Sequence, residues 1–347
     1  MLVIGIDAHK RSHTAVAVDG LGRQVAQCTV NTATADHLGL LRWAEQLDCE
    51  RSWAVEDCRH VSRRLEHDLL VAGERIVRVP PKLMAGARDS ARTVGKSDPI
   101  DALAVARAAL REPDLPTAHL DGPSREVRLL VDHREDLVSE RTRIINRLRW
   151  HLHELDPSWD PRAGTLDRYR ALDAVAARLN QHEGTPARIA RDLVVRCRSL
   201  TFDINGLERE ITALITPLAP TLLAMSGVGA LTAAKIVGEV ADVRRFRSKD
   251  AFARHNGTAP QPAWSGQQDR HRLSRTGNRQ INAALHRIVI TQGRYHPDAI
   301  AYLARRRAAG DTKNEARRAL KRRLSDVVYR ALLADATRTT HELTAAA

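Results

Sequence analysis

The chain has 347 residues, more than one hydrophobic core usually organises, so we expect two or three domains. Its 55 lysines and arginines outnumber its 42 acidic residues, and the formal net charge of +13 favours a polyanionic partner, nucleic acid first. Aromatic residues make up only 3% of the chain, which argues against recognition by rows of base-stacking rings and favours contacts to phosphate.

The sequence also argues against other classes of protein. The four cysteines show no CxxC spacing, so neither a zinc cluster nor a disulfide framework is expected. No window holds the roughly 18 uninterrupted apolar residues of a membrane helix, and the apolar residues 1–6 are too few for a signal sequence. We therefore expect a cytoplasmic protein with reduced thiols and no membrane partner.

Residues 1–118 predict an α/β domain. Apolar and β-branched segments open the chain and predict a hairpin of buried strands. Strands and helices then alternate: strands at 52–55 and 75–79, and helices at about 35–47, 62–72 and 98–111. The last helix has Pro99 in its first turn, where the missing N–H costs nothing.

Residues 119–216 predict a helical, coiled-coil-like linker and oligomerisation region. From Val127 to Leu155, apolar residues recur at spacings of three and four with charged residues between them, which is typical of a long helix seam. A second helical pattern covers about 185–218, and the stretch 156–166 between the two contains proline and glycine and indicates a connector. The patterns fit either an antiparallel helical hairpin or an oligomeric coiled coil.

Residues 217–347 predict a mainly α-helical C-terminal domain. Residues 222–239 resemble a helix-hairpin-helix element whose turn holds Gly227 and Gly229. These glycines could present backbone N–H groups to a phosphate, and a glycine turn between packed helices explains them equally well. A strongly basic helical segment follows over residues 301–335.

Four acidic residues stand where charge is costly without a cation. Asp7 and Glu56 each follow an apolar strand pattern. Asp98 and Asp101 share one face at a helix start, where two like charges repel each other. Each acid alone has a structural explanation, as a turn residue or as N-terminal helix chemistry. Together, in the order strand, strand, helix, they predict one divalent-metal site that acts on phosphodiesters.

The ligand types indicate which metal this site would hold. Oxygen-only ligands, without cysteine or an HExxH motif, favour Mg²⁺ or Mn²⁺ over zinc. Two such ions could activate an attacking oxygen and stabilise the leaving one. Lys10 lies close to Asp7 in the sequence and is a candidate phosphate contact, whereas His9 is assigned no role.

The segments VIGIDAHK, VED and KSDPIDA, in this order and at these separations, resemble the N-terminal domain of the IS110 family of transposases (IS110/IS116/IS902 type). Three later segments resemble the second domain of that family: SGVGALTAAKIVGEV, FRSKDAFARHNGTAP and WSGQQDRHRLSRTGNRQINAAL. The resemblance implies a DNA recombinase with a DEDD tetrad on an RNase H or RuvC-like fold. Its tetrad would be Asp7, Glu56, Asp98 and Asp101.

The resemblance also implies a serine nucleophile in the C-terminal domain. Ser265, between a tryptophan and a glycine, stands at the family's serine position. Its oxygen could attack phosphorus and hold the DNA end as a phosphoserine. Local sequence alone is explained by a turn serine, and Ser274 is the second candidate. The family's recombinases are directed by a structured non-coding RNA, so we expect an RNA partner besides donor and target DNA, and a homo-oligomer, dimer or tetramer.

Basic residues near and beyond this serine are candidate nucleic-acid contacts, although a solvated helix face is the ordinary explanation for such runs. They are Arg270, Arg272, Arg275, Arg279, Arg318, Lys321 and Arg322. Two other functions stay open. One is a RuvC-like nuclease or junction resolvase that uses the acidic tetrad and water alone. The other is a non-enzymatic nucleic-acid-binding protein with a degenerate nuclease fold, against which the presence of all four acids argues.

Overall fold

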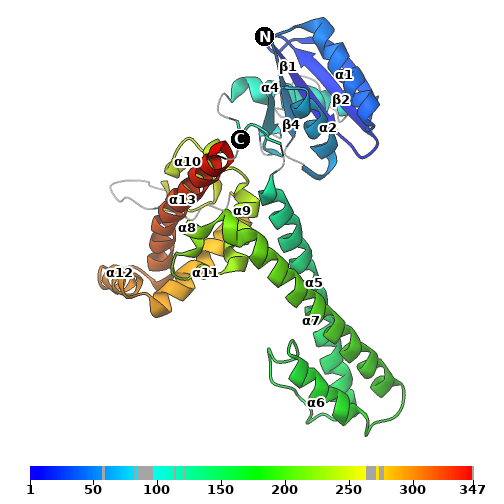
Figure 1. Ribbon diagram of the computed structural model, residues 1–347, viewed down its shortest axis with the longest axis vertical. Helices are drawn as coiled ribbons and strands as arrows, with labels where there is room; N and C mark the ends of the chain where they lie inside the picture. Colours follow the sequence, from blue (N-terminus) through cyan, green and yellow to red (C-terminus); the bar gives the residue numbers. More distant parts are fainter. Residues whose placement is uncertain are drawn as a thin grey trace. The chain divides into compact units, whose positions relative to one another are not determined.

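The computed structural model describes residues 1–56, 59–81, 83–84, 97–112, 115–120, 122–262, 271–272 and 277–345. The chain divides into two compact units, Met1–Asp121 and Gly122–Ala347 (Figure 1). The first unit combines a sheet with helices and the second is mainly helical, in agreement with the sequence. Within the described ranges, no helix is long and apolar enough to cross a membrane.

The first unit is built on a mixed sheet of five strands in the order β3-β2-β1-β4-β5. The strands are β1 (Leu2–Ala8), β2 (Ser12–Val18), β3 (Gln24–Asn31), β4 (Arg51–Glu56) and β5 (Ile76–Val79). β2 is antiparallel to both β1 and β3, whereas β4 runs parallel to β1 and β5 parallel to β4. This mixed sheet fits the predicted RNase H or RuvC-like domain. The prediction that the opening strands are all buried was wrong for β3, a partly exposed edge strand.

Helices cover both faces of this sheet. α1 (Thr34–Leu47) and α2 (Arg59–Val71) pack on one face, and α4 (Asp98–Arg111) packs on the other. Because side chains alternate along a strand, Ile6 of β1 lies in the core below α1 and α2, and Val3 lies in the core below α4. The residues of β1 at odd positions therefore belong to the α4 face.

Gly5 on β1 allows α4 to lie directly on the sheet. A Cβ atom at this position would lie 2.1 Å from the carbonyl oxygen of Ala102 and 2.5 Å from the nitrogen of Ala106. Any side chain here would push the helix away. The contact places the first turn of α4, one turn before Ala102, beside the end of β1, where Asp7 lies two residues after Gly5.

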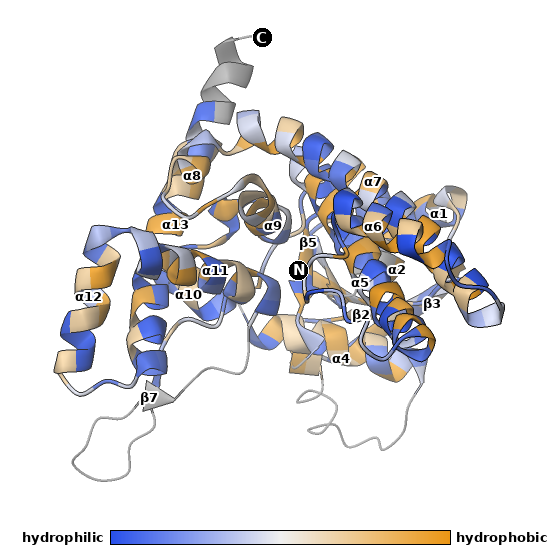
Figure 2. Cartoon of the chain, turned by 90° about the horizontal axis from the view of Figure 1, so that it is seen from below, coloured by the Kyte–Doolittle hydropathy of each residue, from blue (hydrophilic) through white to orange (hydrophobic). Residues whose placement is uncertain are grey.

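The second unit begins with a long helical hairpin. Its helices are α5 (Pro123–Leu155), α6 (Tyr169–Leu179) and α7 (Thr185–Leu218). The helices α5 and α7 are antiparallel, because residues later in α5 contact residues earlier in α7. The pairs are Arg134 with Glu208, Glu140 with Arg196, and Arg141 with Thr201. The hairpin alternative is thus present within one chain, and α6 is a helix that the sequence analysis did not predict. Figure 2 shows hydrophobic and hydrophilic residues alternating along these helices.

The remaining helices of the second unit pack around a second hydrophobic core, to which α5 and α7 also contribute. These remaining helices are α8 (Pro220–Leu223), α9 (Ala230–Val240), η1 (Val243–Arg245), α10 (Lys249–His255), α11 (Arg279–Tyr295), α12 (Pro297–Ala308) and α13 (Lys313–Ala345). Two short strands, β6 (Gln261–Pro262) and β7 (His271–Arg272), pair between α10 and α11. In the predicted helix-hairpin-helix element, the second helix is α9, but the first, α8, has only four residues.

We expect Gly5→Ala to destabilise the first unit, because the added methyl group would overlap the backbone of α4. Overpacking of this kind typically costs about 1–3 kcal/mol. Urea unfolding followed by tryptophan fluorescence would measure the loss. The matched control is Gly39→Ala in α1, where a Cβ would meet nothing within 4 Å, so that variant should be as stable as the parent or more stable. Equal stabilities of the two variants would contradict the close packing at Gly5.

Candidate active site

Two acidic residues occupy matched positions on two neighbouring strands of the sheet. β1 and β4 are parallel, and Ile6 pairs in register with Val55, so Asp7 and Glu56 stand at the next position of each strand. Residues at matched positions of neighbouring strands point to the same face of a sheet. For Asp7 and Glu56 this is the face that α4 covers, because Gly5 lies two positions before Asp7 and contacts α4.

Helix α4 adds two carboxylates from its first turn. Asp98 is the first residue of the helix, and Asp101 follows one turn later and is half-buried. His9, just beyond the end of β1, lies between the strand and the helix. Its Nε2 donates to Asp7 Oδ2 at 2.9 Å and lies 3.3 Å from Asp98 Oδ1. The side chains of β1 and α4 are therefore joined through one imidazole.

Burial and repulsion both oppose the charge on Asp7. The residue is only 7% exposed. Burial raises the pKa of its carboxyl group above the ordinary value, and the charges of Asp101 and Asp98 raise it further while His9 acts in the opposite direction. Partial burial tends to lower the pKa of His9, but Asp7 and Asp98 outweigh it, and the pKa of the imidazole is raised. A divalent cation would favour the ionised carboxylates and remove this conflict.

The donor set at this position suits a divalent cation. One ligand atom each from Asp7, His9 and Asp98 lies within 4.8 Å of the others, and in the described part of the chain this is the one such group of three. His9, to which the sequence alone assigned no role, thus lies beside two of the predicted ligands. The oxygen-only ligand set stays a prediction. An imidazole nitrogen beside carboxylates suits Mn²⁺ better than Mg²⁺, since hard alkaline-earth ions prefer oxygen.

The other predicted residues of this site lie around the group of three. Glu56 is half-buried on the same sheet face as Asp7, and the charge of Asp101 adds to the rise in the pKa of Asp7 that burial mainly causes. Lys10 follows His9 and is exposed, so its ammonium group is accessible to a phosphate. The structure thus collects Asp7 and Asp98 in one group, and the metal role of the full tetrad stays a prediction.

The candidate nucleophile falls outside the described residues. The predicted residues in the segments 263–270 and 273–276, for which the structure gives no description, are Ser265, Ser274, Arg270 and Arg275. The strands on either side are described: Gln261 pairs with Arg272, and Pro262 pairs with His271. Ser265 therefore belongs to the segment that connects the two strands of a β6–β7 hairpin.

Gly227 and Gly229 have different structural positions. Gly227 adopts φ +80°, and a Cβ there would lie 3.3 Å from side-chain atoms of Thr291 and Gln292 in α11. Gln292 also donates to the carbonyl oxygen of Ser226 at 2.7 Å. Packing against α11 thus accounts for Gly227. Gly229 is the N-cap of α9, and a Cβ there would meet nothing within 4 Å, so its phosphate contact stays a prediction.

The basic residues predicted on α13 already have partners inside the protein. Lys321 is 9% exposed, and its Nζ donates to Asn282 Oδ1 at 2.8 Å. Burial and, to a smaller degree, Arg318 lower the pKa of Lys321. The neighbours pair with acids: Arg318 with Glu315, and Arg322 with Asp250 and Asp326. Substitutions at Lys321 would first disturb packing, whereas Arg279 at the start of α11 is exposed.

Two family models match the chain. The first, DEDD_Tnp_IS110, is described as a transposase model and matches residues 4–157. The second, described as the transposase IS116/IS110/IS902 family, matches residues 219–304. The first match contains the acidic group and the second contains Ser265. Together the two matches cover more than half of the chain.

Curated relatives extend the similarity over nearly the whole length. The insertion element IS116 uncharacterized 44.8 kDa protein of Streptomyces clavuligerus is 29% identical, over 96% of this chain and 94% of its own. The insertion element IS900 uncharacterized 42 kDa protein of Mycobacterium paratuberculosis is 26% identical over 95% of each chain. A solved structure, T. thermophilus RuvC in complex with Holliday junction substrate, is 16% identical over 34% of this chain and 99% of that chain. Its TM-score is 0.27, and no argument about the fold is based on it. By its two family matches and its insertion-element relatives, the chain belongs to the IS110 family of transposases.

Proposed function

We propose that this transposase cuts and rejoins DNA with a divalent-metal site formed by Asp7, Glu56, Asp98 and Asp101 and with Ser265 as nucleophile. The observation that carries the metal half of the proposal is the convergence of Asp7, His9 and Asp98, whose ligand atoms lie within 4.8 Å of one another. A bound Mg²⁺ or Mn²⁺ would supply Lewis-acid polarisation of the phosphodiester and stabilise the charge that develops on its oxygens.

The protein residues fix the geometry of this centre. Asp7 and Glu56 are held by paired strands, and Asp98 and Asp101 by the first turn of α4, so all four carboxylates stand on regular secondary structure. Sites built on helices and strands keep their geometry better than sites built on loops. His9 contacts Asp7 and Asp98 through its Nε2 and would orient them, and the exposed Lys10 would contact the phosphate of the bound strand.

The serine half of the proposal rests on the second family match, which contains Ser265. The serine Oγ attacks phosphorus, its proton passes to a base, and the bond from phosphorus to the leaving oxygen of the DNA strand breaks. The new phosphoserine bond keeps the strand end attached to the protein until another strand end displaces the serine. The product is a rejoined phosphodiester, and no net hydrolysis occurs.

The proposed nucleic-acid partners rest on the same family membership. We propose that a structured non-coding RNA encoded in the element guides the protein to donor and target DNA, and that a homo-oligomer, dimer or tetramer, carries out the exchange. The net charge of +13 supports a partner with many phosphates. A protein that leaves sequence recognition to base pairing needs contacts to phosphate and to duplex shape more than contacts to base edges.

A second candidate function is a metal-dependent nuclease or junction resolvase that uses water in place of serine. The observation that favours it is that Asp7, His9 and Asp98, whose ligand atoms lie close together, all belong to the first unit, Met1–Asp121. The two functions differ in their intermediate, because only the serine reaction joins DNA covalently to the protein.

We expect Mn²⁺ to raise the thermal unfolding midpoint of the protein, and more strongly than Mg²⁺ does. One ion at a hundred times its dissociation constant stabilises by about 2.7 kcal/mol. Asp7→Asn should abolish this effect. Without metal it should be at least as stable as the parent, because it removes a buried carboxylate that its neighbours repel. Asp36→Asn, in the first turn of α1, is the control and should keep the metal effect. A metal effect that survives Asp7→Asn would contradict the site.

The serine is tested by trapping the covalent intermediate. The full chain, incubated with its RNA, metal and DNA that carries the element ends, should give an adduct that survives denaturation in detergent. Ser265→Ala should give none, whereas Ser274→Ala should still form it. Adduct formation by Ser265→Ala would refute the serine assignment. Cleavage without adduct that survives Ser265→Ala but not Asp7→Ala would instead support the resolvase function.

The RNA partner is tested by recombination in vitro with the element's flanking non-coding RNA added or withheld. We expect joined DNA products only when the RNA is present. An RNA of the same length and scrambled sequence serves as the control for charge alone. Equal product yields with the two RNAs, or without RNA, would show that sequence recognition resides in the protein.

A further inference from the structure

The two ends of the β6–β7 hairpin region meet at one point of the second unit. Gly277, which follows the hairpin, adopts φ +105°, and a Cβ there would lie 2.7 Å from both the nitrogen of Gly257 and the carbonyl oxygen of His255. The backbone nitrogen of Asn278 donates to the same carbonyl oxygen at 2.6 Å. The chain therefore runs from His255–Gly257 to the hairpin and comes back beside His255–Gly257 at Gly277 and Asn278.

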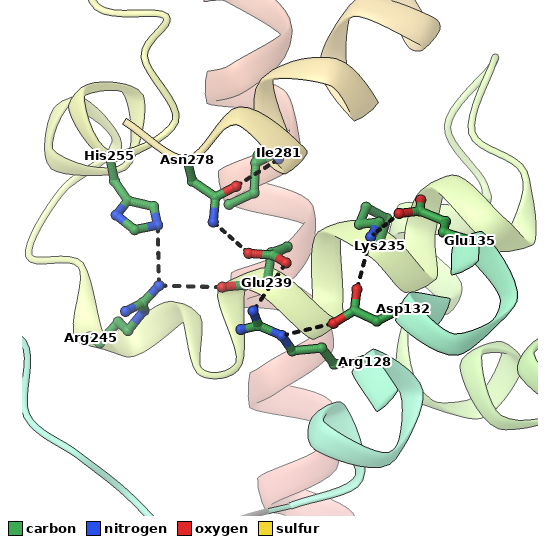
Figure 3. Close-up of polar contacts among 9 residues, drawn as sticks. All are labelled: Arg128, Asp132, Glu135, Lys235, Glu239, Arg245, His255, Asn278 and Ile281. Atoms are coloured by element: carbon green, nitrogen blue, oxygen red, sulfur yellow. Dashed lines mark hydrogen bonds and ion pairs between the residues drawn. The ribbon is translucent and has the colours of Figure 1, made fainter. Parts of the chain in front are cut away.

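The side-chain amide of Asn278 makes one hydrogen bond with its oxygen and one with its nitrogen, and both hold the chain where it enters α11. Its Oδ1 accepts from the backbone nitrogen of Ile281 at 2.9 Å and so caps α11. Its Nδ2 donates to Glu239 Oε2 of α9 at 2.5 Å. Glu239 is only 5% exposed, and Arg128 Nη2 of α5 lies 3.5 Å from its other oxygen (Figure 3). Only one orientation of the Asn278 amide satisfies both partners.

The helix that carries Glu239 is itself firmly held. Lys235, one turn earlier in α9 and 3% exposed, contacts Asp132 at 3.1 Å and Glu135 at 2.8 Å, both in α5 (Figure 3). A Cβ at Gly238 would lie 2.9 Å from the Cα of Arg128, so α9 and α5 are in close backbone contact. The Glu239 carboxylate consequently has little freedom to follow a displaced hairpin.

A third connection joins this group to the start of the hairpin region. Arg245 Nη2 lies 3.4 Å from the backbone carbonyl oxygen of Glu239 and 3.3 Å from His255 Nε2. From the other side, Asn282 Nδ2 donates to the carbonyl oxygen of Asn256 at 2.8 Å. The point at which both ends of the hairpin region meet is thus tied to α9 and to α11.

We propose that Asn278 and Glu239 are positioning residues for the strand-exchange reaction: their hydrogen bond fixes the point at which the chain enters α11, beside His255–Gly257, and so holds in place the ends of the region that carries the nucleophile. The proposal rests on the proposed role of Ser265. A buried carboxylate is costly to desolvate, so this pair is a poor source of stability and a good source of one defined geometry. A reacting atom misplaced by about 1 Å can lose roughly a hundredfold in rate.

The test exchanges donor and acceptor between the two residues. In Asn278→Asp the new carboxylate still caps Ile281 but faces Glu239 with like charge. In Glu239→Gln the new amide must turn its NH₂ either towards Asn278 or towards Arg128, and both are donors. In the double variant Glu239→Gln/Asn278→Asp, glutamine donates to the new aspartate and presents its oxygen to Arg128. The hydrogen bond between the two positions is thus restored with donor and acceptor exchanged, and Arg128 and Ile281 keep an oxygen as acceptor.

We expect each single variant to slow formation of the covalent adduct by about tenfold to a hundredfold, and the double variant to recover most of the lost rate. Such recovery is a coupling that a general loss of stability does not produce. Thr312→Ala, which removes the N-terminal contacts of α13 to Glu315, is the control and should lower the unfolding midpoint without slowing the adduct. Single variants no slower than Thr312→Ala, or a double variant without recovery, would overturn the proposal.

Hydrogen exchange separates this proposal from the serine assignment. Peptides covering residues 253–262 and 277–285 should exchange faster in each single variant and return to parent rates in the double variant, whatever the nucleophile is. If Ser265→Ala still forms the adduct while the exchange pattern is as expected, the serine assignment fails. The hydrogen bond between Asn278 and Glu239 would then still hold the ends of the hairpin region. If the exchange rates do not change, the positioning role fails independently.

Discussion

The absence of a side chain at Gly5 is the constraint on which the acidic centre depends. Helix α4 can lie against β1 only because no Cβ occupies the space 2.1 Å from the Ala102 carbonyl oxygen. That contact fixes both the height of the helix above the sheet and its register along the strand. With α4 so placed, its first turn brings Asp98 to within reach of His9 and, through His9, of Asp7. A centre made from two strands and a helix thus derives its geometry from backbone packing.

The same packing creates an electrostatic cost. It brings carboxylates from different elements close together, and burial of Asp7 adds to their mutual repulsion, so the pKa of Asp7 is raised. His9 relieves part of the cost, because its own pKa is raised by Asp7 and Asp98 and its protonated form is favoured. A core that served stability alone would hold apolar residues here. Charge conflicts of this kind concentrate at functional sites, where a ligand can offset them.

Sequence periodicity predicted the long elements well. The bounds 98–111 for α4 and 185–218 for α7 agree with the structure, because a long amphipathic pattern with clear end signals has few alternatives. The order of Asp7, Glu56 and the α4 acids also followed from the sequence. His9 did not, because its contacts depend on a helix that begins 89 positions later, at Asp98. Gly5 gave no signal either, since a glycine in a strand is ordinary until the packed helix is known.

Shorter elements were harder to predict for the same physical reason. α6 (Tyr169–Leu179) and the four-residue α8 owe their structure to packing against α7 and the C-terminal core rather than to local pattern. The edge position of β3 likewise depends on which strands pair. A window of ten residues contains no signal for these short helices or for the edge position, because contacts with distant parts of the chain decide both.

The two halves of the proposed active site are therefore positioned by different means. The residues of the proposed metal centre stand on strands and a helix, whose backbone hydrogen bonds fix their positions. Of the β6–β7 hairpin, the structure describes two residues in each strand, and so short a ladder has little stability of its own. Its placement must come from its ends, where Gly277 touches Gly257 and where Asn278 is held by buried Glu239. A buried charge is costly in a helical core, and a geometric requirement at the hairpin gives a physical reason for retaining it.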